Sequence, residues 1–185
     1  MGSDDTHHAD LTNFSGSASK REIYETILLS CEGLFFEQRN WVCNLANAAS
    51  LLWHGYKTNT HDTKQNAVNW AGFYVLDPSN KDQLILGPFQ GKVACQTIKI
   101  GNGVCGTAAS TRETQLVRDV EKFPGHIACD GGTKSEIVVP IVLNDEAKTV
   151  VGVIDIDCEE LEGFDEVDKE YLEKLANVIA DSCDW

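Results

Sequence analysis

Positive charge is scarce in this sequence. Its 185 residues include 15 Lys and Arg against 29 Asp and Glu, a formal net charge of −14 at pH 7. Such a chain repels phosphate backbones and anionic lipids, and no local basic patch offsets that repulsion. We therefore expect neither nucleic acid nor a membrane surface as a partner.

Long apolar runs are also missing, and no stretch approaches the length of a membrane span. The first twenty residues, MGSDDTHHADLTNFSGSASK, are acidic and small polar where a signal peptide is basic and then apolar. The sequence thus predicts a cytoplasmic protein. Residues 1–19 offer little to bury, so we expect a flexible arm there and a single domain over residues 20–185.

The paired C-x-x-C spacing of common zinc sites is absent too. Seven cysteines, an odd number for a reducing compartment, argue against a structural disulfide framework. A zinc site of Cys95, Cys105, Cys129 and His126 is a weak alternative, because H-x-x-C alone is unspecific, and we expect no metal and no cofactor. The remaining cysteines fall on predicted helices or a strand and are interpreted as structural or incidental: Cys31, Cys43, Cys158 and Cys183.

Gly101, Gly103 and Gly106 match the dinucleotide-binding pattern G-x-G-x-x-G, and Asp119 lies near the position of a ribose-binding acid. That pattern requires a βαβ unit with a full crossover helix. Only about two helical turns fit between residues 104 and 111 before the chain reads as extended again. The nucleotide interpretation therefore stays a weak alternative.

Hydrophobic periodicity predicts the order of the elements. Apolar residues at helical spacing predict helices over residues 20–34 and 41–56, a short helix after Gly103, and a last helix capped by Asp165. Turn residues at 78–80 and at Gly87-Pro88 separate the first three of five strand-like runs. These runs cover residues 68–77, 83–89, 92–100, 136–143 and 149–157.

Short connections between consecutive runs favour antiparallel pairing. The last two runs, 136–143 and 149–157, form a hairpin across NDEAK. An irregular segment covers residues 118–135. A mainly antiparallel sheet with its helices segregated from it is an α+β fold. The chain also lacks the internal repeats of a solenoid.

Two carboxylates stand on one face of the last predicted strand. Alternation places Val151, Val153, Asp155 and Asp157 together, with Ile154, Ile156 and Cys158 opposite. A solvated sheet face is the plainer interpretation, but the valines favour partial burial. Buried neighbouring acids would have their pKa values raised and separated, leaving one protonated near neutral pH.

Trp70, Gly72 and Tyr74 share a face of the first predicted strand. We expect the glycine to leave an open space between the two rings, in which a cationic or thioether group could lodge. Ordinary core packing is the alternative interpretation.

Six motifs in order, NWAGFYV, ILGPFQGKVACQTI, GVCGTAA, PGHIACD, SEIVVPI and GVIDID, together resemble the free methionine-(R)-sulfoxide reductases, a family of GAF-domain enzymes. The resemblance implies a GAF-like antiparallel sheet with helices on one side and a small ligand pocket on the other. It implies that Cys129 is the catalytic cysteine and Cys95 its resolving partner, with Cys105 as a third cysteine of open role. A homodimer is consistent with it.

The resemblance further implies that Glu136, Asp155 and Asp157 hold the substrate and that Trp70 and Tyr74 are pocket aromatics. The expected reaction reduces free L-methionine (R)-sulfoxide through a sulfenic acid and a disulfide, which thioredoxin then reduces. Glu136 is the first choice of acid because a sulfoxide oxygen must be protonated or hydrogen-bonded before a thiolate attacks. The alternative is a GAF module that senses a small molecule or oxidation without turnover.

Overall fold

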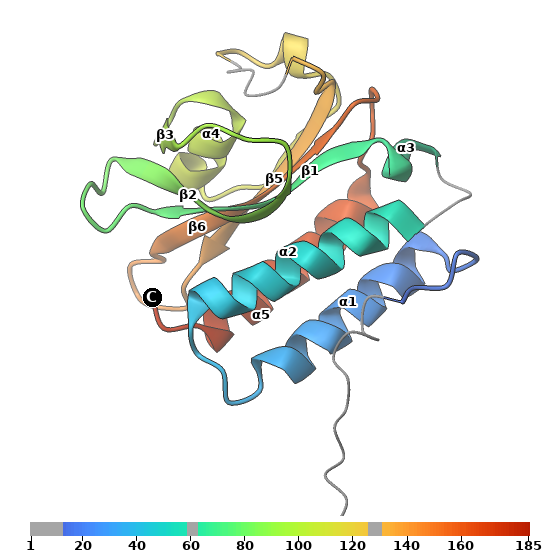
Figure 1. Ribbon diagram of the computed structural model, residues 1–185. Helices are drawn as coiled ribbons and strands as arrows, with labels where there is room; N and C mark the ends of the chain where they lie inside the picture. The colour runs from blue at the N-terminus through green and yellow to red at the C-terminus, as the bar shows by residue number, and fades with distance from the viewer. Residues whose placement is uncertain (1–12, 59–62, 126–130) are drawn as a thin grey trace, which may run out of the picture.

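A six-stranded antiparallel sheet forms the centre of the computed structural model, which describes residues 13–58, 63–125 and 131–185 (Figure 1). The strand order is β3-β2-β1-β6-β5-β4, and every pair is antiparallel. The elements are α1 Lys20–Phe35, α2 Trp41–Thr58, α3 Thr63–Asn66, β1 Val68–Leu76, β2 Gln83–Gly91, β3 Thr97–Lys99, α4 Gly103–Thr111, β4 Gln115–Val117, a short 3-10 turn η2 Val120–Lys122, β5 Ser135–Val142, β6 Val150–Cys158 and α5 Glu166–Ser182.

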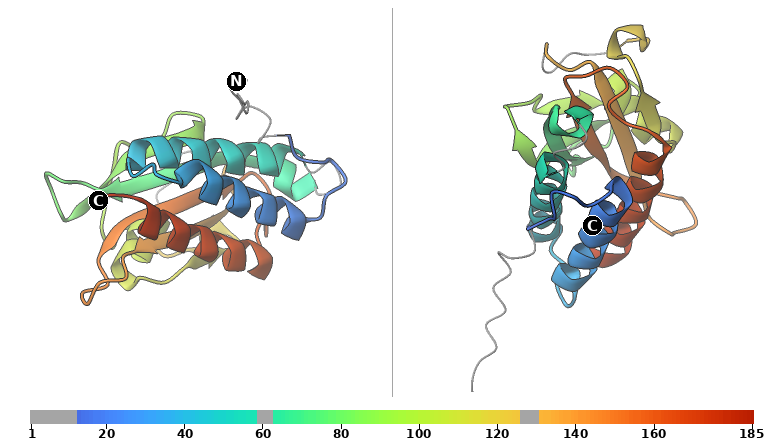
Figure 2. Two further views of the ribbon diagram at one scale, coloured as in Figure 1. Left: turned by 90° about the horizontal axis from the view of Figure 1, so that it is seen from below. Right: turned by 90° about the vertical axis from the view of Figure 1, so that its right-hand side faces the viewer.

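Three helices cover one face of the sheet. Figure 2 shows α1 lying between α2 and α5, with the sheet behind them. Alternate strand residues such as Phe73, Ile137 and Ile154 point into this layer and are fully buried. The larger of the two buried apolar clusters lies here and forms the main core. Burial of each such side chain contributes about 1.5–3 kcal/mol to the free energy of unfolding.

Side-chain caps fix where the first and last helices of this layer begin. Ser19 and Asp165 each form a capping box with the residue three positions on, Glu22 and Asp168. Such caps satisfy backbone N–H groups that have no partner inside the helix. The prediction that Asp165 caps the last helix is confirmed.

A buried polar network joins the same helices. The Tyr24 hydroxyl donates to Asp168 Oδ1 at 2.7 Å, and Lys20 Nζ donates to Asp168 Oδ2 at 2.7 Å. Asp168 is completely buried, and Tyr56 from α2 bonds to Tyr24. A paired and fully hydrogen-bonded carboxylate can be buried, so this network locks α1, α2 and α5 together.

The opposite face of the sheet carries α4 and a second apolar cluster. Val104 and Ala108 of α4 pack there with Tyr74, Val138 and Val153 from three strands. This smaller core leaves room beside it, and the site described below lies on this side (Figure 1). The α+β prediction is confirmed: the three long helices lie on one side of the sheet, and the pocket lies on the other beside the short helix α4.

Two local predictions are wrong. Gly87 and Pro88 do not end a strand; they lie inside β2, where the pairing with β1 shifts between Gly72 and Tyr74. A β-bulge tolerates proline because its missing N–H removes no ladder bond there. The expected strand over residues 92–100 shortens to Thr97–Lys99, and residues 92–96 are irregular.

A second bulge changes the face of one valine. Pairing of β5 with β6 shifts between Ile141 and Val142, so Val151 packs with the helical layer rather than beside Val153. The other members of that predicted face are placed as expected.

The nucleotide alternative is excluded by the topology. The nine residues of α4 lead to β4, which pairs antiparallel with β5, so no parallel βαβ unit surrounds the glycine motif. Asp119 instead caps η2 and forms an ion pair with Lys122.

None of the helices in the described ranges combines the length and apolar character that crossing a bilayer requires. The predicted arm over residues 1–19 falls mainly outside those ranges and stays a prediction. Within it, Phe14 and Ala18 pack against the main core.

Candidate active site

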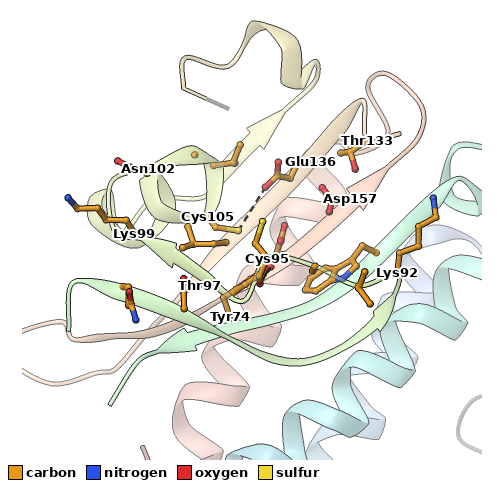
Figure 3. A pocket seen from close by; sticks show the side chains of 18 residues that line it. Tyr74, Lys92, Cys95, Thr97, Lys99, Asn102, Cys105, Thr133, Glu136 and Asp157 are labelled. Carbon is orange, nitrogen blue, oxygen red and sulfur yellow. Dashed lines mark hydrogen bonds between the residues drawn. The ribbon is translucent and has the colours of Figure 1, made fainter. Parts of the chain in front are cut away.

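A cavity of about 310 Å³ opens between β1, β6, β5, α4 and the segment that follows β2 (Figure 3). It gathers every predicted site residue that the structure describes: Trp70, Tyr74, Cys95, Cys105, Glu136, Asp155 and Asp157. Cys129, the predicted catalytic residue, lies outside the described residues.

Strand pairing brings the three carboxyl groups together. Glu136 of β5 lies directly opposite Asp157 of β6, and Asp155 follows two residues away on the same face. Glu136 is 7% exposed and Asp155 is 6% exposed, while Asp157 is partly buried. The interpretation of these acids as a solvated face is therefore wrong, because α4 and the β2–β3 segment cover them.

Burial separates the protonation states of these acids. Desolvation, with the charges of Asp155 and Asp157, raises the pKa of Glu136 well above its ordinary value. Desolvation raises the pKa of Asp155 to about 6, while hydrogen bonds from Cys105 and Glu136 oppose that rise. Burial therefore favours the protonated form of both acids, and most strongly that of Glu136.

Two buried polar atoms of the cavity wall have no hydrogen-bond partner among the described residues: Asp155 Oδ1 and Trp70 Nε1. One is an acceptor and the other a donor. Buried polar atoms are nearly always paired in folded proteins. These two unpaired atoms mark this wall as a candidate binding surface for a polar ligand.

The aromatic wall differs from expectation. The Trp70 and Tyr74 rings stack, with centroids 5.8 Å apart and planes at 23°, and Trp70 also stacks on Phe89 at 5.1 Å. A Cβ on Gly72 would lie 2.3 Å from Phe89 Cβ and 2.9 Å from the Pro88 carbonyl oxygen. The predicted open space between the rings is wrong, because the β2 bulge fills it; the rings line the cavity as a wall.

The glycine motif places Cys105 in the cavity. Gly101 and Gly103 adopt φ values of +88° and +63°, and a Cβ on Gly106 would lie 2.4 Å from the Lys99 carbonyl oxygen. Glycine alone suits these positions. The chain therefore turns sharply into α4, whose third residue is Cys105.

Cys105 is a buried thiol beside the acids. Its Sγ lies 3.9 Å from Glu136 Oε1, a long S–H···O contact. Burial, with the charges of Asp155 and Glu136, raises the pKa of Cys105 well above its ordinary value. A thiol that stays protonated is a poor nucleophile, so this environment disfavours Cys105 as the attacking residue.

Cys95 lies in the irregular segment after β2 and is disulfide-bonded. The Tyr74 hydroxyl donates to its carbonyl oxygen at 3.0 Å. Five other described cysteines are free, and among those interpreted as structural only Cys43 is exposed. The disulfide removes the Cys95 thiolate from any zinc site of the kind considered above.

Several other lining residues have no recognisable signal in the sequence. Gln83, Lys92, Thr97, Asn102 and Thr133 also reach the cavity wall. They come from turns and strand ends brought together by the fold. No local spacing could have identified them.

Within the described ranges, Cys105, Glu136 and Asp155 also have ligand atoms within 4.8 Å of one another. That spacing could serve a divalent cation. The ammonium group of an amino acid is an alternative cation for the same carboxylates.

Known proteins share this architecture and sequence. The GAF domain family matches residues 63–182, a range that includes every lining residue named above. The chain is 65% identical to the free methionine-R-sulfoxide reductase of Saccharomyces cerevisiae over 177 residues, 96% of this chain and 94% of that protein. Identity to the free methionine-R-sulfoxide reductase of Escherichia coli is 38% over 157 residues, 85% of this chain and 86% of the relative.

A solved structure agrees with these matches. The free methionine-R-sulfoxide reductase from Neisseria meningitidis, in complex with its substrate, aligns with a TM-score of 0.80 at 38% identity. The alignment covers 92% of this chain and 93% of that chain.

Proposed function

Because the chain belongs to the free methionine-R-sulfoxide reductases, within the GAF-domain family, we propose that it reduces free L-methionine (R)-sulfoxide to L-methionine. The observation that carries the proposal is chemical: a disulfide-forming cysteine, Cys95, shares one small cavity with the buried acid Glu136. A thiol and a protonated acid are what sulfoxide reduction requires.

The proposed first step is attack by the Cys129 thiolate on the sulfoxide. Glu136 hydrogen-bonds to the sulfoxide oxygen and supplies its proton. The S–O bond of the sulfoxide then breaks as the oxygen passes to the Cys129 sulfur. Methionine leaves as a thioether, and Cys129 becomes a sulfenic acid. The sulfoxide is reduced by two electrons, and the cysteine is oxidised by two.

The Cys95 thiol then condenses with the sulfenic acid. A sulfur–sulfur bond forms and the sulfenic oxygen leaves as water. The disulfide of Cys95 in the structure, with five other described cysteines free, supports a pairing of Cys95 with Cys129. We assign Cys105 a supporting role beside Glu136, because its thiol stays protonated.

Binding of the free amino acid is proposed to use the two aspartates. The ionised Asp155, with Asp157 beside it, pairs with the substrate ammonium group, and the Trp70 ring covers the methyl end. Replacing that ammonium by a peptide bond would leave the buried Asp155 carboxylate without its cation. Protein-bound methionine sulfoxide is therefore a poor substrate.

Reset requires an external dithiol, and we propose thioredoxin. Exchange with such a dithiol returns Cys95 and Cys129 to thiols. A reducing compartment suits this chemistry, and we propose that the protein acts in the cytoplasm.

The test is thioredoxin-coupled NADPH consumption with free L-methionine (R)-sulfoxide, its S epimer and a blocked peptide analogue. We expect turnover with the free R form only and its loss in Cys129→Ser. The exposed thiol of Cys43, on the helical layer, supplies the matched control Cys43→Ser, which should keep full activity.

The alternative of a sensing GAF module makes the opposite prediction. Folded and fully reduced protein would then bind ligand but consume no NADPH with either epimer. That result would remove the proposed reaction.

A further inference from the structure

The segment that carries Cys95 connects β2 to β3 and contacts the smaller apolar cluster through Ala94. Residues 92–96 form no regular structure, and Val93 is 91% exposed. Leu86 N–H donates to the Gln96 carbonyl oxygen at 3.0 Å, which fixes the end of the segment that leads into β3. At Cys95 itself, the Tyr74 hydroxyl reaches from the sheet to the carbonyl oxygen at 3.0 Å.

Tyr74 is well suited to hold a fixed point. Its side chain is 1% exposed, its ring stacks on Trp70, and its backbone belongs to the central strand β1. Figure 3 shows Tyr74 on the sheet side of the cavity, close to Cys95. The hydroxyl is the only polar atom of this side chain, and it is used on the Cys95 backbone.

Tyr74 is not a suitable proton donor for the reaction. Burial, with the neighbouring acids, raises the pKa of its hydroxyl above the ordinary value, so it remains a neutral hydrogen-bond donor. A neutral donor suits a carbonyl oxygen and keeps that bond throughout the working pH range.

We propose that the Tyr74 hydroxyl is a positioning group for the resolving cysteine, holding the Cys95 segment at the cavity so that its thiol meets the sulfenic acid. This inference rests on the proposed function. It adds a role in the second step of the reaction, separate from the contact of the Tyr74 ring with the cavity.

The role matters most in the reduced protein. In that state the disulfide of Cys95 is reduced, and the hydrogen bond from the Tyr74 hydroxyl connects this exposed segment to the sheet. Condensation forms the sulfur–sulfur bond and releases water only when the two sulfur atoms meet. A segment held less often in place closes the disulfide more slowly.

The experiment is a single turnover of reduced Tyr74→Phe with free methionine (R)-sulfoxide, in which methionine formed and thiols lost are followed together. Phenylalanine keeps the ring and removes the hydroxyl. We expect the rate of disulfide closure, relative to the rate of methionine formation, to fall about five- to tenfold, the effect of one hydrogen bond. A sulfenic acid should accumulate and be trapped by dimedone.

Tyr171→Phe is the matched control, because its hydroxyl bonds to Glu25 at 3.0 Å in the helical layer. It should leave both rates unchanged. A second measurement is the equilibrium of the Cys95 disulfide with dithiothreitol, which should shift toward the reduced form by a similar factor in Tyr74→Phe.

The inference is overturned if Tyr74→Phe slows both steps by the same factor, or changes neither step nor the disulfide equilibrium. Wild type that forms methionine without losing two thiols would instead contradict the proposed disulfide mechanism. The two failures are therefore distinguishable.

Discussion

Glu136 and Asp155 are chemically similar side chains whose pKa values the fold raises to different extents. Both are buried on neighbouring strands, yet Asp155 keeps a pKa of about 6 while Glu136 is raised further. One can give a proton and the other can hold a cation. The division of roles arises from their surroundings.

Replacing Glu136 by glutamine tests the first role. Glutamine can still donate a hydrogen bond but has no proton to transfer, so kcat with free methionine (R)-sulfoxide should fall at least about a hundredfold. KM should change much less. Steady-state kinetics of Glu136→Gln and of the exposed control Glu146→Gln measure this difference. Equal activity of both variants would exclude Glu136 as the acid.

Asp155 links the site to stability. Its pKa in the folded protein, about 6, lies above the ordinary 3.8, so the folded state holds this proton more tightly than the unfolded state. Its contribution to the free energy of unfolding is therefore present below about pH 4 and is lost as the pH rises through about 6. At pH 7 the ionised side chain destabilises the fold.

Asp155→Asn should consequently be more stable than wild type at pH 7, by on the order of 2 kcal/mol, and lose substrate binding. The gain should shrink toward pH 4. Denaturant unfolding at several pH values checks this, with the exposed Asp82→Asn as control. An Asp155→Asn protein less stable than wild type at pH 7 would contradict the explanation.

At the scale of elements, the interruption of β2 was predicted at the right residues but with the wrong structure. Gly87 and Pro88 interrupt regular pairing as predicted, but the interruption is a bulge rather than a turn. Proline and glycine mark both. Whether a bulge or a turn forms depends on pairing with the neighbouring strand β1, and the local sequence of β2 does not determine that pairing.

Gly72 opposite this bulge provides a test. A methyl group there would collide with Phe89 and the Pro88 backbone, so Gly72→Ala should lower the free energy of unfolding by about 1–3 kcal/mol. Gly33, in α1, has nothing within 4 Å of an added Cβ. Gly33→Ala should raise stability by about 0.5–1 kcal/mol. Thermal unfolding that shows the same sign for both would contradict the packing.

Elements whose order follows from local pattern were predicted well. The capped helices and the strands of the last hairpin have periodicity that their own residues carry, and the acids fell on the predicted face. The conformation of the Cys95 segment was not predicted correctly, because it depends on a disulfide and on Tyr74 from a distant strand. Cavity-lining residues such as Thr133 were missed for the same reason.

At the scale of the whole molecule, the main core and the candidate active site lie on opposite faces of one sheet. The helical layer holds the main core, and the cavity occupies the other face. The outer side of that layer exposes Leu29 by 72% and Phe36 by 76%. Large apolar side chains exposed to this extent are candidates for an interface.

The homodimer remains a prediction, and this outer side is where we expect its contact. Wild type should sediment as a dimer, and Phe36→Asp should shift it toward monomer. Turnover should persist in the variant, because Phe36 directly follows α1 in the helical layer and does not line the cavity. A monomeric wild type at micromolar concentration would show the prediction to be wrong.

The first and last helices are joined by Lys20, Tyr24 and Asp168, and Trp41 stacks on Trp185 with centroids 6.3 Å apart. The central strand β1 likewise pairs with β6. On the ribosome, these partners emerge far apart in time, so the core cannot close until α5 has been synthesised. Closure of the core is therefore a late event in the synthesis of this domain. Until the core closes, the fold does not yet protect the cysteines of the nascent chain from oxidation.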